Sequence, residues 1–140
     1  MANEAVIQVR IESPLPFTVA DGTGIEKGAL LALTSPRTAA TAAGTAEKIA
    51  GFAAREKVAS DGRTELGVYR RGWFLCYCSG TINIGDPIVA AATGTYPNYV
   101  SAAGVTASGA TIIGHALEAA TNGQQKLMEI NIGAGAGAVS

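Results

Sequence analysis

The side chains able to carry out chemistry are few and widely spaced. The 140 residues include one histidine, His115, and two cysteines, Cys76 and Cys78. Catalysis needs attacking and titrating groups held in one mutual geometry. No two carboxylates stand in a recognisable acid–base motif, and the segment around His115 favours a packed or half-exposed strand residue over a general base. The sequence therefore predicts no catalytic residues and no enzymatic activity.

Metal and cofactor sites are not indicated either. The cysteines are alternate residues of an expected strand, so both point to one face, and no second pair completes a zinc site. We interpret them as buried free thiols. The segment Asp21-Gly-Thr-Gly24 lacks the lysine and the following helix of a phosphate-binding loop. The expectation is no cofactor and no metal.

The composition is poor in charge and rich in small residues. Charged residues make up 15% of the chain, the net charge is −1 and 18 residues are glycine. A nucleic-acid interface needs clustered Lys and Arg, and Arg70-Arg71 is too small a cluster. No apolar run approaches the roughly 18 residues of a membrane-spanning helix, and no leader peptide is recognisable. We expect a protein made in a reducing cytoplasm, with neither nucleic acid nor membrane as a partner.

Short apolar segments separated by Gly-rich turns predict an all-β fold, a small barrel or sandwich. In residues 5–12 the alternation places Ala5, Ile7, Val9 and Ile11 on one face, and Val6 on the other with Gln8, Arg10 and Glu12. Residues 35–47 are small and polar, which indicates a long loop, and a helical turn is expected after 54. Further strands are expected at 30–34, 48–54, 65–71, 73–78, 87–92, 96–101, 111–117 and 126–132.

The chain divides into three parts by composition. Residues 1–16 are predicted to form an N-terminal extended arm, because Pro14 and Pro16 lack backbone donors and stop the first strand. Residues 17–132 form one barrel-like domain. Residues 133–140, a Gly/Ala tail ending in Val-Ser, are expected to be disordered and flexible. Alternatively, residues 5–12 are the first strand of the protein's own barrel.

An internal repeat organises the barrel-like domain. Three short segments recur in the same order at a distance of about 60 residues, which indicates two pseudo-repeats, about 25–70 and 82–132. Each is expected to supply one side of a pseudo-symmetric barrel. In this alignment His115 takes the place of Phe52. The pairs are 25–32 with 82–89, 49–53 with 112–116, and 61–62 with 122–123.

Four segments, 25–33, 49–54, 80–89 and 112–118, resemble small decoration (head cement) proteins of tailed bacteriophages. The resemblance covers roughly residues 5–132, but not the loop 35–47 or the Gly/Ala tail. It implies an all-β fold related to the β-tulip, with no catalytic residues. It also implies homotrimers at three-fold positions of an expanded capsid, and an N-terminal arm that pairs with strands of the major capsid protein.

Two sets of residues are candidates for partner binding. An arm of alternating character can add a strand to a neighbouring coat subunit, with side chains setting the register. The large aromatic rings favour a contact between subunits, although packing in the core and hairpins is the alternative. The capsid-binding candidates are Val6, Ile7, Val9 and Ile11, and the subunit-contact candidates are Trp73, Tyr96 and Tyr99.

The function expected from these observations is structural. The protein would decorate the outer capsid surface of a virion as a trimer and stabilise the shell against internal DNA pressure. One alternative is a structural subunit elsewhere in the virion, such as a tail or spike component. Another is a carbohydrate- or ligand-binding β module, for which residues 96–99 (Tyr-Pro-Asn-Tyr) are the only candidate stretch.

Overall fold

The computed structural model describes residues 4–10, 12–44, 48–92, 98–102 and 111–132. The described residues contain strands and no helix, so the all-β prediction is confirmed and the helical turn expected after 54 is wrong. The predicted tail 133–140 lies outside them. The strands are β1 (Val6–Arg10), β2 (Leu15–Thr18), β3 (Leu30–Ser35), β4 (Thr38–Thr41), β5 (Ile49–Ala53), β6 (Glu65–Tyr69), β7 (Arg71–Tyr77), β8 (Pro87–Ala90), β9 (Val100–Ala102), β10 (Ile112–Ala116) and β11 (Gln125–Asn131).

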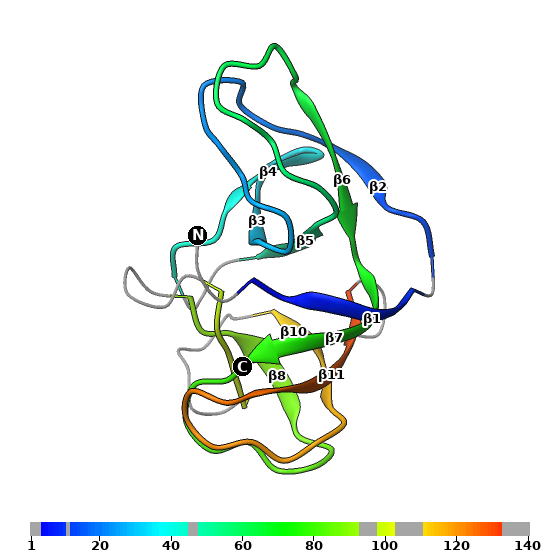
Figure 1. Ribbon diagram of the computed structural model, residues 1–140, viewed down its shortest axis with the longest axis vertical. Coiled ribbons are helices and arrows are strands. Elements are labelled where there is room, and N and C mark those ends of the chain that lie inside the picture. The colour runs from blue at the N-terminus through cyan, green and yellow to red at the C-terminus, as the bar shows by residue number, and fades with distance from the viewer. Residues whose placement is uncertain (1–3, 11, 45–47, 93–97, 103–110, 133–140) are drawn as a thin grey trace.

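The strands form two units that lie side by side (Figure 1). The first half of the chain closes a five-stranded barrel in the order β2-β4-β3-β5-β6. The second half, together with β1, forms a six-stranded sheet in the order β1-β7-β11-β10-β8-β9. The small barrel was predicted, but the expectation that each half supplies one side of a shared barrel is wrong, because the first half closes on itself.

The two halves share one scheme of strand pairing. In the first half Leu31 of β3 faces Gly51 of β5, and in the second half Ile88 of β8 faces Gly114 of β10. Both pairs of strands shift register after this position. Both glycines are needed for space, because a Cβ at Gly51 or Gly114 would fall on a carbonyl oxygen of the neighbouring strand. The closest packing of each half is therefore built at equivalent positions.

Two strands of the first barrel lie where the sequence indicated a break and a loop. β2 includes Pro16 and pairs antiparallel with β6, so the prolines do not end strand structure there. β4 lies within the expected loop 35–47 and pairs with β3, burying Ala39 in the barrel. Small side chains give a weak strand pattern, yet a methyl group suffices to fill the centre of a narrow barrel.

One apolar core joins the halves. Most of its members come from the second half, but Leu30 and Phe52 from the first half belong to the same cluster. The rings of Phe52 and Phe74 stack with their centroids 5.0 Å apart. The fully buried Asn98 accepts a hydrogen bond from the Leu30 N–H at 2.9 Å. The barrel and the sheet are thus held together by packing and by a buried polar contact.

A buried lysine ties together two turns of the first half. The Lys57 ammonium is inaccessible to solvent and lies 3.1 Å from a carboxylate oxygen of Asp61 and 3.4 Å from one of Asp21. It also donates to the backbone carbonyls of Asp21 and Val58. A hydrogen bond from the Arg63 N–H, helped by Lys57, holds the pKa of Asp61 below its usual range. A buried cation is tolerated here because every donor direction meets an acceptor.

Candidate functional site

The N-terminal strand lies at an edge of the six-stranded sheet. Among the described residues β1 pairs only with β7, so its other edge has no partner strand. That edge borders a pocket of about 420 Å³, lined from the first half by Lys27, Gly28 and Tyr69, among others. In the isolated chain β1 is a strand of the protein's own sheet and not a separate arm. An unpaired edge still offers backbone donors and acceptors to a partner.

The alternation expected for residues 5–12 is interrupted by a β-bulge. Ile7 faces Phe74, whereas Val9 faces Trp73, so β1 uses an additional residue at Gln8. Ile7 therefore packs against the core, while Val9 points to the opposite side and is 45% exposed. The expectation that Ile7 and Val9 share a face is wrong, because a bulge changes the side on which the following residues lie.

Apolar side chains gather on the outer side of the sheet. Val6 pairs with Leu75, which pairs with Leu127, and Val9 pairs with Trp73 in the neighbouring row. Cross-strand partners point to the same side of a sheet, so these side chains form one surface. Val6 is 49% and Trp73 38% exposed. We call this surface the outer face. Its apolar members are Val6, Val9, Trp73, Leu75, Leu127 and Leu117, whose N–H donates to the Leu127 carbonyl, and Glu129, the cross-strand partner of Trp73, borders them on the same side.

The structure thus brings together three residues that the sequence assigned to two different contacts: Val6, Val9 and Trp73. Reasoning from sequence missed the leucines of the outer face, although alternation in residues 73–77 and 125–131 carries the signal.

The other aromatic candidates do not lie on this surface. Tyr99 is buried and its ring stacks on Tyr77 with centroids 5.8 Å apart. Ile11 and Tyr96 lie outside the described residues. A glycan site at 96–99 requires exposed side chains. Asn98 and Tyr99 are both buried, so neither is available to bind a glycan.

The two cysteines and the histidine of the sheet lie in different surroundings. Cys76 and Cys78 are fully buried, and burial raises the pKa of the Cys78 thiol to about 11 and that of Cys76 further. His115 is exposed and lies across from Glu129. Within the part of the chain that the structure describes, no three His, Cys, Asp or Glu side chains could hold a metal ion.

We predict that both cysteines resist modification in the folded protein. At pH 8 the thiols remain protonated and buried, so a disulfide reagent such as dithionitrobenzoate should react with neither. In denaturant both should react within minutes. Rapid release of the coloured thiolate from native protein would contradict the buried, protonated state.

A comparison with known protein families identifies the family of the chain. The family described as "Structural cement protein (E217 gp24/Pam3 gp6)" matches residues 2–133. The chain belongs to this phage cement family. No curated protein matches it. The decoration-protein resemblance seen in the sequence is confirmed.

Membership gives the cement protein a structural role in a phage capsid and places it in the virion, bound to the capsid shell. None of the described residues forms a helix that could cross a membrane. A large exposed apolar surface usually marks a site of contact with a partner. The outer face therefore fits the structural role of the family.

Proposed function

We propose that the cement protein attaches to the outer surface of a phage head by packing its outer face on the major capsid protein. The observation that carries this proposal is the apolar surface spanning β1, β7 and β11. Monomeric proteins rarely leave a large contiguous apolar surface exposed. Because cement proteins bind the capsid shell, the coat subunit is the occupant we assign to it.

The individual candidates receive different roles in this arrangement. Val6 and Val9 contact the coat directly, and Ile11 continues the same segment. Ile7 supports them from inside, because its side chain packs on the core. Trp73, expected from sequence at a contact between copies, lies beside Val9, so we assign it to the coat contact. A large aromatic ring is a common energetic centre of an interface.

We further propose that the protein acts as a homotrimer at three-fold positions. Three linked contacts combine through effective concentration, so modest individual affinities give tight attachment. A trimer that grips several coat subunits opposes their separation when packaged DNA presses on the shell. No described residue is assigned to the contact between copies.

Removal of the protein should make particles less robust. Filled heads assembled without it are expected to rupture at a lower temperature and after a milder osmotic shock than complete heads. Addition of purified protein should return the rupture temperature and the resistance to osmotic shock to those of complete heads, and DNA release followed with an intercalating dye measures both. Equal rupture temperatures with and without the protein would contradict the cementing role.

A further inference from the structure

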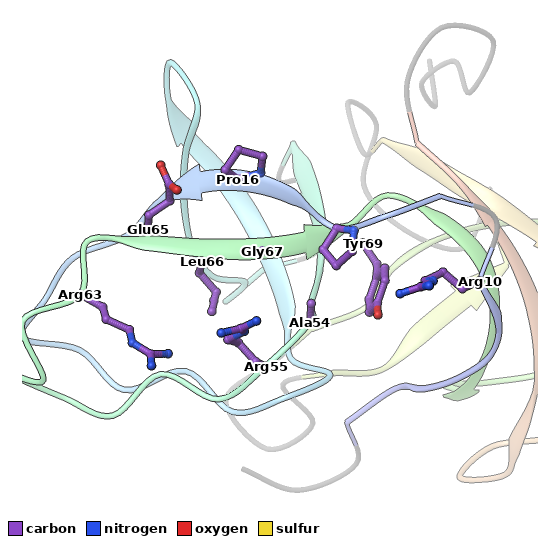
Figure 2. Close-up of a pocket in the computed structure, with 10 residues that line it drawn as sticks. Arg10, Pro16, Ala54, Arg55, Arg63, Glu65, Leu66, Gly67 and Tyr69 are labelled. Carbon is purple, nitrogen blue, oxygen red and sulfur yellow. The ribbon is translucent and has the colours of Figure 1, made fainter.

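A groove beside β2 and β6 has a different character from the outer face. Its volume is about 610 Å³, and its lining includes three arginines, Arg10, Arg55 and Arg63, with the Tyr69 ring. We call this hollow the arginine groove. Figure 2 shows Arg55 and Arg63 extending on one side of β6, with Tyr69 and Arg10 farther along, while Glu65 extends away from both arginines.

The charge in this groove is unbalanced. Among the described residues that line it, Glu65 is the only one with a carboxylate. None of the three guanidinium groups forms an ion pair with another described residue, although the chain as a whole has a net charge of −1. Guanidinium groups bind carboxylates in paired, planar hydrogen bonds. The groove is therefore complementary to a negatively charged segment.

The arginine groove occupies the same place in the first half that the outer face occupies in the second. Pro16 of β2 faces Gly67 of β6, as Leu75 of β7 faces Leu127 of β11. The backbone N–H of Ala54 bonds to the Gly67 carbonyl, as the N–H of Leu117 bonds to the Leu127 carbonyl.

Where the second half carries leucine, the first half therefore carries Pro16, Gly67 and Ala54. These smaller side chains leave the surface hollow. The equivalent faces of the two halves therefore differ: the second half has an apolar surface there, and the first half has a basic groove.

We infer that the cement protein grips the capsid with this face of both halves, and that the arginine groove binds an acidic segment of the coat subunit. The inference depends on the proposed function, because it adds a second contact with the same partner. Arg10 lies on β1, the strand that also carries Val6 and Val9. Val9 pairs with Trp73 and Arg10 pairs with Gly72, so these two neighbouring side chains point to opposite sides of β1. The arginine groove and the outer face therefore meet at this strand and form two separate contacts.

Charge reversal in the groove tests this inference. The variant Arg55→Glu/Arg63→Glu should fold like wild type, because both side chains are exposed. It should bind particles assembled without cement protein at least about tenfold more weakly, and the weakened binding should depend less on salt. The control Arg37→Glu/Lys48→Glu makes the same change in charge at exposed positions outside the groove and should bind like wild type.

A photo-crosslinker in place of Arg55 identifies the occupant directly. On the capsid it should capture a coat peptide rich in Asp and Glu. Unchanged capsid affinity of the groove variant, or capture of a neutral peptide or of DNA, would overturn the inference. The proposed function would still hold in that case, provided that the wild-type protein binds capsids. Failure of the wild-type protein to bind capsids would instead contradict the proposed function itself.

Discussion

The double variant Val6→Glu/Val9→Glu is expected to remain folded and to lose attachment to capsids by at least about 100-fold. Both side chains are about half exposed, at 49% and 45%, so little apolar burial within the chain is lost. At an interface with the coat, two carboxylates would be stripped of water without partners, at a cost of several kcal/mol. The effect on binding should therefore far exceed the effect on stability.

A matched control separates this effect from a general change in charge. Val58 and Ile84 are exposed apolar residues, at 59% and 73%, outside the outer face. The variant Val58→Glu/Ile84→Glu should bind capsids like wild type. Cosedimentation with cement-free heads measures binding, and thermal unfolding verifies that each variant is folded. Equal losses in both double variants would show that the outer face is not the contact.

Truncation of the buried lysine should have the largest effect on stability. Lys57→Ala removes a fully buried side chain and leaves two backbone carbonyls and two carboxylates without their shared donor. A loss of about 3 kcal/mol in the free energy of unfolding is expected, which lowers the melting temperature by roughly 10 °C. Lys27→Ala, at an exposed position, serves as the control and should change little.

The pH dependence gives a second measure of the same contact. The pKa of Asp61 is lowered in the folded chain, so its contribution is complete above the unfolded-state pKa and is lost as the pH falls through the folded-state value. The difference in stability between wild type and Lys57→Ala should therefore narrow in acid. A difference that stays constant from pH 7 down to pH 2 would show that Lys57 stabilises through its packing and its backbone hydrogen bonds, and not through the Asp61 carboxylate.

Most of the fold could be predicted from the alternation of apolar and polar residues and from the turns. The strands that bury large residues, such as 73–78 and 126–132, were predicted within two residues, and segments 25–32 and 82–89 pointed to halves that prove to share strand register. β4 was missed because its small residues resemble a loop, and closure of the first barrel was missed because β2 contains Pro16. Local composition does not indicate which strand edges pair to close a barrel.

The site was harder to predict than the fold. Val6, Val9 and Trp73 were each identified, but the bulge at Gln8 decides which of the β1 side chains face outward. A bulge of one residue in the pairing of two strands cannot be recognised from the hydrophobic pattern of the sequence. The arginine groove could not be seen either, because Arg10 is distant in sequence from Arg55 and Arg63 and joins them only when β1 lies beside the barrel.

Cryo-electron microscopy of purified mature heads tests the attachment most directly. We expect density for this chain on the exterior of the shell, with Val6, Val9 and Trp73 turned toward a coat subunit and hidden from solvent. A map in which the chain is absent from the head, or in which these three side chains face open solvent, would contradict the account.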